Sequence, residues 1–218
     1  MLRRTILAKP SHHLMWTYFS PLGKYCVTAG YNENRDENDA FIYSMEDPNY
    51  VHCIGDTHCF SSDDTFVLFS IDRALLKFDT KHGSVRFLFN APNCIWDIAI
   101  SPDHRFVALA MTDHNVEIRS IETADLIHDL GVRSYSVSYS PDGTRLATAY
   151  NSQTLISSTT SGVELARLDN PLSSNAFFSP CGKFLLYGNV ARSLQNWESQ
   201  EILSVDALSS DGQYFIAS

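Results

Sequence analysis

Apolar and polar residues alternate over short stretches along most of the chain. Residues 135–168 show the pattern: "YSVSYS", "TRLATAY" and "VELARL" alternate, and "TLISS" is apolar and β-branched. Alternation with a period of two is typical of half-buried strands, and the short turn segments "PDG", "NSQ" and "TTSG" separate the runs. The segment therefore predicts four short strands joined by tight turns, and helical periodicity is absent from it. An all-β fold is expected.

The same order of strands and turns recurs along the chain. Residues 57–89 and 94–130 each read as four strands, and a serine tetrad marks the first turn of each unit. The tetrads are SPLG at Ser20, SSDD at Ser61, SPDH at Ser101, SPDG at Ser140, SPCG at Ser179 and SSDG at Ser209. Their serines are 41, 40, 39, 39 and 30 residues apart. A period of about 40 indicates an array of units, none of which buries its apolar face alone.

The tetrad has the residues that a hairpin corner needs. In the copy at 140–143, Pro141 fixes φ at the first central position, and Asp142 can accept a hydrogen bond from the local backbone. Gly143 adopts positive φ at low cost. The serine is therefore interpreted as part of a turn and not as a catalytic nucleophile.

Four-stranded antiparallel units that repeat about every 40 residues resemble the blades of a β-propeller, and specifically those of the WD-repeat family. In that family a Trp-Asp dipeptide closes the third strand, and Trp197-Glu198 stands at that spacing after Ser179. Phe78-Asp79 takes the position with one residue deleted, whereas Arg119-Ser120 and Ser158-Thr159 replace the dipeptide. Trp96-Asp97 precedes Ser101 and belongs to a first strand, so it is not this motif.

The family's Gly-His dipeptide is absent from the places where the resemblance puts it, about ten residues before each serine. The resemblance therefore implies degenerate blades that are held together mainly by apolar packing. The segment "NRDENDAFIYSMED" also resembles the tandem repeats of TolB-like and peptidase-associated propellers. In that alternative, the chain is the propeller domain of a larger protein and gates or binds substrate for a catalytic domain outside this chain.

A single propeller domain is expected over residues 1–218. The expected blades are roughly 11–54, 55–89, 92–130, 133–168 and 173–204, with a partial sixth blade formed by 205–218 and an N-terminal strand at 3–9. The partial blade lacks strands, which leaves three alternatives: a truncated propeller, an internally deleted one, or part of a larger assembly. An open blade edge invites pairing with a second copy or with a missing chain segment.

Charge and composition narrow the classes of partner. The chain carries 16 Lys and Arg against 25 Asp and Glu, a net charge of -9, which argues against nucleic acid because phosphate binding needs a basic stripe. No apolar run approaches the length of about 18 residues that spans a membrane. The start of the chain fails as a secretory signal. The five cysteines are dispersed without a CxxC pair, so we expect reduced thiols and a cytoplasmic or nuclear location.

Motifs of catalysis are absent from the sequence: it has no GxSxG elbow, phosphate-binding loop, HExxH or zinc-type Cys/His quartet. The acidic segment at 32–38 lacks the glycine and the terminal glutamate of a calcium loop, so it is interpreted as a solvated loop. We therefore expect no enzyme activity, no cofactor and no metal site.

A propeller without catalytic motifs usually serves as a platform for other proteins, so we expect a scaffold that binds proteins or peptides. Loops between second and third strands are candidates, together with the connections that precede first strands. The candidates in the first group are Asn34, Arg35, Asp36, Glu37, Asp72, Arg73, Asp113, His114 and Asn151. Those in the second group are His12, His13, Arg133 and Tyr135. Arg and Tyr are frequent anchors at protein interfaces.

Overall fold

The computed structural model describes residues 12–32, 37–47, 49–55, 58–169, 175–187, 190–194, 199–201, 207–208 and 215–216. Within these residues the chain forms strands and turns and contains no helix, which confirms the all-β prediction. Contacts between residues divide the chain into two compact units, residues 1–87 and 88–218. Each unit is described by itself, and the single domain over 1–218 stays a prediction.

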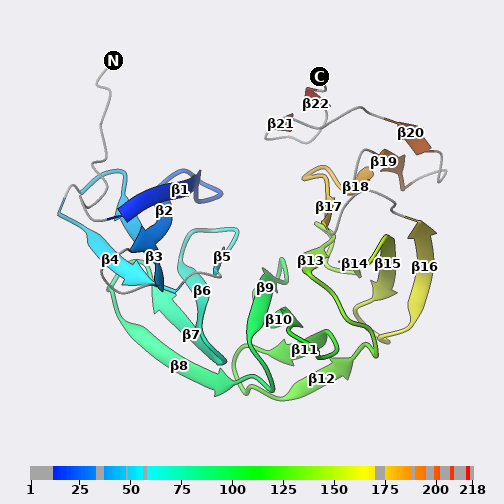
Figure 1. The fold of residues 1–218 in the computed structure, drawn as a ribbon, viewed down its shortest axis with the longest axis horizontal. Coiled ribbons are helices and arrows are strands. Elements are labelled where there is room, and N and C mark those ends of the chain that lie inside the picture. Colours follow the sequence, from blue (N-terminus) through cyan, green and yellow to red (C-terminus); the bar gives the residue numbers. More distant parts are fainter. Residues whose placement is uncertain are drawn as a thin grey trace. The chain divides into compact units, whose positions relative to one another are not determined.

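The described strands form five four-stranded antiparallel sheets and one hairpin (Figure 1). The first two sheets are β1 (His12–Phe19), β2 (Tyr25–Asn32), β3 (Glu37–Ser44) and β4 (Val51–Ile54), and β5 (His58–Phe60), β6 (Phe66–Ile71), β7 (Ala74–Asp79) and β8 (Val85–Asn90). The next two are β9 (Ile95–Ile100), β10 (Phe106–Met111), β11 (Glu117–Ser120) and β12 (Leu126–Asp129), and β13 (Ser136–Tyr139), β14 (Arg145–Tyr150), β15 (Gln153–Ser158) and β16 (Glu164–Asp169). The fifth is β17 (Ala176–Phe178), β18 (Phe184–Tyr187), β19 (Val190–Ser193) and β20 (Ser199–Glu201), and the hairpin is β21 (Ala207–Leu208) and β22 (Phe215–Ile216).

In every sheet the spatial order of the strands follows the order of the chain. Repeated four-stranded antiparallel sheets are compatible with the blades of a β-propeller. The predicted N-terminal strand at 3–9, the tetrad at Ser209 and the dipeptide Trp197-Glu198 lie outside the described residues.

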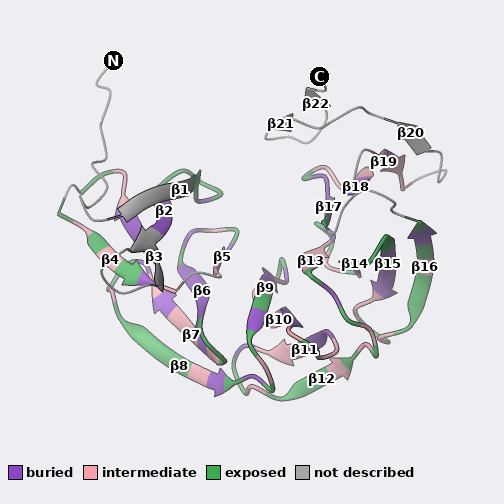
Figure 2. Ribbon diagram, viewed as in Figure 1, coloured by how far each residue is buried: buried purple, intermediate pink, exposed green. Residues whose placement is uncertain are grey.

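Burial follows strand position within each sheet. The second strands β6, β10 and β14 are almost entirely buried, whereas the fourth strands β8, β12 and β16 are mostly exposed (Figure 2). The apolar clusters join neighbouring sheets within a unit. In unit 1, Val27 and Ile42 pack with Val67 and Phe78. In unit 2, one cluster joins the β9–β12 and β13–β16 sheets, and another joins β13–β16 to β17–β20. Within each unit, neighbouring sheets therefore share an apolar core.

A buried serine builds the first turn of each four-stranded sheet. Its Oγ accepts a hydrogen bond of 2.9–3.0 Å from the backbone N–H five residues later, and its own N–H donates to the carbonyl of that residue. The serines are Ser20, Ser61, Ser101, Ser140 and Ser179, and their partners are Tyr25, Phe66, Phe106, Arg145 and Phe184. Because these hydroxyls accept hydrogen bonds from backbone groups in a turn, the predicted hairpin turn is confirmed at the five described tetrads.

The fourth residue of each of the five described tetrads has positive φ. Gly143 adopts φ 72°, as predicted, and Gly23 and Gly182 adopt similar values. Asp64 and His104 take the same position at φ 59° and 61°. Left-handed backbone costs a residue with a Cβ about 1 kcal/mol or more, so these two turns must be held by further contacts.

A second capped turn follows the third strand, at the position that the WD-repeat resemblance assigns to an aspartate. Asp79 Oδ1 accepts from the N–H groups of Lys81 and His82 at 2.9 and 2.8 Å. Ser120 and Ser158 cap the equivalent turns through Oγ. Ser158 thus stands where Asp79 stands, so the pair that replaces the dipeptide is Ser157-Ser158, one residue earlier than the spacing predicted.

Unit 1 links its two sheets through Asp64, which lies in the turn between β5 and β6. The Asp64 carboxylate accepts from Ser20 Oγ at 2.5 Å and from the N–H groups of Leu22 and Lys24 at 3.2 and 3.3 Å. It therefore caps the first turn of the preceding sheet. This contact explains how the copy "SPLG" forms its turn although Leu22 stands where Asp142 stands in "SPDG".

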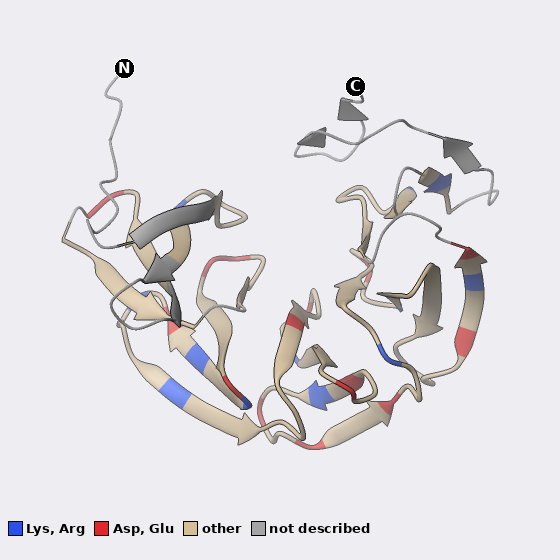
Figure 3. Cartoon of the chain, in the orientation of Figure 1, with Lys and Arg blue, Asp and Glu red and all other residues tan. Residues whose placement is uncertain are grey.

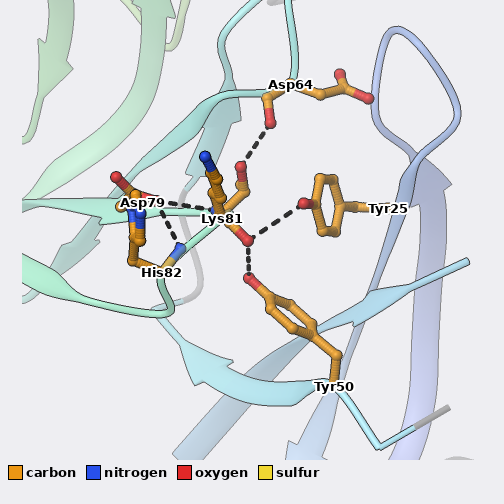
Figure 4. A network of polar contacts seen from close by, with 7 residues as sticks. Tyr25, Tyr50, Asp64, Asp79, Lys81 and His82 are labelled. Carbon is orange, nitrogen blue, oxygen red and sulfur yellow. Dashed lines mark hydrogen bonds and ion pairs between the residues drawn. The ribbon is translucent and has the colours of Figure 1, made fainter. Parts of the chain in front are cut away.

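The buried Thr80 extends this link. Figure 4 shows its partners Asp64, Tyr25 and Tyr50. Thr80 Oγ1 donates to the carbonyl oxygen of Asp64 at 2.6 Å. The carbonyl oxygen of Thr80 accepts from two phenols of the other sheet, Tyr50 at 2.5 Å and Tyr25 at 3.2 Å. Burial, followed by the proximity of Tyr25, raises the pKa of Tyr50 well above its ordinary value, so this hydroxyl remains a donor.

Unit 2 links its sheets through their first strands. Asp97 in β9 accepts a hydrogen bond through Oδ2 from the N–H of Val137 in β13, at 2.9 Å. Ser138 in β13 accepts from the N–H of Phe178 in β17, at 3.3 Å. The first strands β9, β13 and β17 therefore lie side by side, joined by side chains that reach the backbone one repeat further on.

Candidate interaction surface

The predicted loop residues that the structure describes in unit 2 lie at one end of the sheets. Asp113 and His114 lie between β10 and β11, Asn151 lies between β14 and β15, and Arg133 and Tyr135 precede β13. In an antiparallel sheet the second hairpin and the start of the first strand share one end, which explains the grouping. Asp113 and Asn151 have positive φ, as tight hairpin turns require.

Three aromatic side chains form a contact chain at this end. Trp96 meets Tyr135 edge-on with ring centroids 5.8 Å apart, and Tyr135 meets Tyr150 at 4.9 Å. Trp96 is 56% exposed and Tyr135 is 39% exposed. Trp96 and Tyr135 each stand five residues before the turn serine of their own sheet, Ser101 and Ser140. Successive repeats therefore present an aromatic ring at the same place.

An ion pair lies next to these rings. Arg133 Nη1 lies 3.1 Å from Asp113 Oδ1, and both side chains are largely exposed. A pair as exposed as this contributes little to folding stability, because solvent screens it and both side chains lose entropy. Arg133 and Tyr150 line the same hollow of about 230 Å³, so the pair adjoins the rings. We refer to Trp96, Tyr135 and Tyr150 with Asp113 and Arg133 as the aromatic face.

The hollow beside the aromatic face is polar on one wall. Arg167 lines it and is held by Glu164 and Gln153, with Nη2 2.7 Å from Glu164 Oε2. Thr148 also lines it, and its buried hydroxyl makes no hydrogen bond within the described residues. The lining of the hollow therefore includes a guanidinium and a buried hydroxyl without a partner among the described residues.

Asp97 follows Trp96 in the sequence. Its hydrogen bond from Val137 joins β9, which carries Trp96, to β13. Burial raises the pKa of Asp97 to about 6, and hydrogen bonds from the N–H groups of Val137 and Ile98 and from Ser136 oppose the rise. The carboxyl group therefore changes charge close to neutral pH while it ties β9 to β13. Sequence reasoning set Trp96-Asp97 aside as a first-strand pair. The recurrence of an aromatic five residues before the serine is the signal that could have singled out Trp96.

His114 is engaged in the fold. Its Nε2 lies 3.1 Å from Oε1 of the buried Glu117, whose Oε2 lies 2.6 Å from Nε of Arg119. The Arg119 guanidinium in turn lies over the Phe89 ring, 5.1 Å from its centroid. The contacts from the Arg119 guanidinium and the His114 ring offset the cost of burying Glu117. The structure therefore places His114 on the rim of a core ion-pair group rather than in the aromatic face.

The remaining predicted residues belong to unit 1. Asp72 and Arg73 form the exposed turn between β6 and β7. In backbone register His12 pairs with Asn32, which pairs with Glu37, so His12 and Glu37 flank one end of the first sheet, next to His13. Asn34, Arg35 and Asp36 lie outside the described residues.

Lys and Arg are scattered singly along the described strands and do not form a stripe (Figure 3). Among the described residues no cluster of three or more His, Cys, Asp or Glu is placed to hold a metal ion. No helix in the described ranges is long and apolar enough to cross a membrane. No protein-family model matches the chain, and a search of curated proteins finds no match either.

Proposed function

We propose that the chain is a non-enzymatic, WD-repeat-like scaffold that binds other proteins through the aromatic face. The observation that carries the proposal is the exposed pair Trp96 and Tyr135, which stand at equivalent positions of consecutive repeats and touch each other. The WD-repeat-like assignment is supported by the turn serines and by Asp79, which caps its turn at the position of the family's aspartate.

The chemistry of the face favours a protein partner. Trp, Tyr and Arg are the residues most enriched among the energetic anchors of interfaces. Trp96 keeps over half of its surface in water, at a cost in hydration free energy that a bound partner would recover. The rings lie at strand ends and contact one another, so the face is preorganised and loses little entropy on binding.

The test compares the proteins retained by three immobilised versions of the chain. The wild type, the double variant Trp96→Ala/Tyr135→Ala and the control Leu165→Ala are incubated with the same cell lysate and quantified by mass spectrometry. Leu165 is 55% exposed on β16, so its loss removes apolar surface of the same sheet away from the face.

We expect partners that the wild type and Leu165→Ala retain equally and that the double variant loses by roughly tenfold or more, the effect of losing one or two anchors. Thermal melts of the three proteins establish that each is folded. Equal retention by the wild type and the folded double variant would contradict the proposal.

A further inference from the structure

A cavity of about 610 Å³ lies between the β9–β12 and β13–β16 sheets. It is lined by the first turns of both sheets, with Asp103 in one and Asp142 in the other, and by Thr160 in the last turn of the second sheet. These turns are at the end of the strands opposite to the aromatic face. The volume is that of a typical small-ligand site, and the site is separate from the proposed interaction surface.

The lining combines an apolar floor with two acidic groups. Phe106, Ile118 and the ring of Tyr139 supply the floor, and the lining includes no Lys or Arg among the described residues. The outer strand is fastened by His128, whose Nε2 lies 3.0 Å from the carbonyl oxygen of Thr160. The cavity is therefore bounded on both sides, and two aspartates line it.

Both carboxylates use a single oxygen in their own turns. Asp103 Oδ1 accepts from Ser101 Oγ at 2.6 Å and from the Arg105 N–H at 3.1 Å. Asp142 Oδ1 accepts from Ser140 Oγ at 2.6 Å and from the Thr144 N–H at 3.0 Å. No hydrogen bond from a described residue reaches Oδ2 of either aspartate, so each retains an acceptor.

The two aspartates are ionised at neutral pH. The hydrogen bond from Ser140 and that from the Thr144 backbone hold the pKa of Asp142 below its ordinary value. Burial raises the pKa of Asp103, but the hydrogen bonds from Ser101 and Arg105 outweigh it and the net shift is downward. The charges of Arg105 and Arg145 also lower the pKa values of Asp103 and Asp142, respectively. Neither arginine lines the cavity, so the two carboxylates are the acidic groups that it presents to a ligand.

Tyr139 supplies a third acceptor. Its hydroxyl oxygen is buried and has no hydrogen-bond partner within the described residues. Burial, and then the charge of Asp103, raise its pKa, so the phenol stays protonated. A buried hydroxyl without a partner is unfavourable, and a ligand that donates a hydrogen bond to it would remove that cost.

We propose that this cavity binds a primary ammonium group on an apolar stem, such as a lysine side chain of a partner or a free alkylamine. The ammonium has three N–H donors for Asp103, Asp142 and Tyr139, and its stem packs on Phe106 and Ile118. The Phe106 ring already makes a cation–π contact, because the Arg105 guanidinium lies 5.4 Å from its centroid.

The first test needs no mutation. Binding of Nα-acetyl-lysine N-methylamide to the wild-type chain is measured by NMR titration against its norleucine counterpart, which keeps the apolar stem and lacks the charge. We expect the lysine derivative to bind on the order of tenfold more tightly, the effect of one charge-assisted hydrogen-bond set. Equal affinity for the two compounds, or binding of neither, would overturn the proposal.

A third compound, n-butylamine, distinguishes the two sources of the ammonium group. Affinity equal to that of the lysine derivative supports a free amine as the ligand. Tighter binding of the lysine derivative supports a lysine of a partner protein.

The second test assigns the binding to the cavity. Asp103→Asn/Asp142→Asn is expected to weaken binding of the lysine derivative roughly tenfold or more, and Tyr139→Phe by a smaller factor. The matched control is Asp63→Asn, because Asp63 follows Ser61 at the same turn position and caps Thr65 in unit 1. Wild-type affinity in the double variant, or equal weakening in the control, would show that the ammonium does not bind there. Tyr139→Phe decides the matter if the double variant does not fold.

Discussion

The two units connect neighbouring sheets in different ways, although their strands follow the same order. In unit 1 the link runs through turns: Asp64 caps the turn of the preceding sheet, and Thr80 receives two tyrosine hydroxyls from that sheet. In unit 2 it runs through first strands, where Asp97 and Ser138 each accept from the backbone of the next sheet. The repeated sequence pattern therefore determines the strand order of each sheet. Neighbouring sheets are joined by different side chains, which lie in turns in unit 1 and in first strands in unit 2.

The largest expected effect comes from breaking the unit 1 link at Asp64. Asp64→Ala removes the acceptor of three donors of the Ser20 turn and leaves an alanine at positive φ. We expect a loss of about 3 to 4 kcal/mol in the free energy of unfolding, measured by urea denaturation.

The neighbouring Asp63→Ala is the control for this change. Asp63 accepts from Thr65 in an exposed turn, so its loss is expected to cost less than about 1 kcal/mol. Similar costs for the two variants would mean that Asp64 does not join the sheets energetically.

The unit 2 link is expected to depend on pH. The pKa of Asp97 is raised to about 6 by burial, above its ordinary value, so the folded state binds its proton more tightly than the unfolded state. Its contribution to stability is complete below the unfolded pKa and is lost as pH rises through 6. Between pH 4.5 and 7.5 we expect a loss of about 2 kcal/mol that Asp97→Asn does not show, measured by urea denaturation at both pH values. Parallel pH profiles for the two proteins would refute this assignment.

The smallest expected effect concerns the two hydrogen bonds to the Thr80 carbonyl in unit 1. Tyr25 and Tyr50 both donate to the carbonyl oxygen of Thr80, so either phenol satisfies it alone. Tyr50→Phe and Tyr25→Phe are each expected to cost about 1 kcal/mol or less, and the double variant more than their sum, because it orphans a buried carbonyl. Thermal denaturation of the four proteins of the cycle measures the coupling, and strict additivity would argue against a shared acceptor.

Most of the sheet structure could be predicted from local sequence. The tetrads place Pro, Asp and Gly where a turn needs them, and alternation places the flanking strands, so both signals lie within a few residues. The position of the capped turn after the third strand was harder to predict from the sequence. The spacing from Ser140 suggested Ser158-Thr159, but the hairpin before it is one residue shorter than that count assumes.

The connections between sheets could not be predicted, because each joins residues about one repeat apart. Asp64 reads as an ordinary turn residue, and nothing near it in sequence shows that its carboxylate caps Ser20. Only part of the aromatic face could be predicted from the sequence. Tyr135, Arg133 and Asp113 were predicted as loop residues, whereas Trp96 and Tyr150 were predicted as strand residues. Their exposure depends on the end of the strand at which they lie, which only the assembled sheets reveal.

The recurring serine turn also gives the chain a set of internal reporters. The amides of Tyr25, Phe66, Phe106, Arg145 and Phe184 each donate to a serine Oγ in chemically similar surroundings. Differences in their hydrogen-exchange rates therefore reflect how readily each sheet opens, with little contribution from local chemistry. Five equivalent protons thus allow the opening of each repeat to be timed in a single experiment, from the first sheet to the fifth.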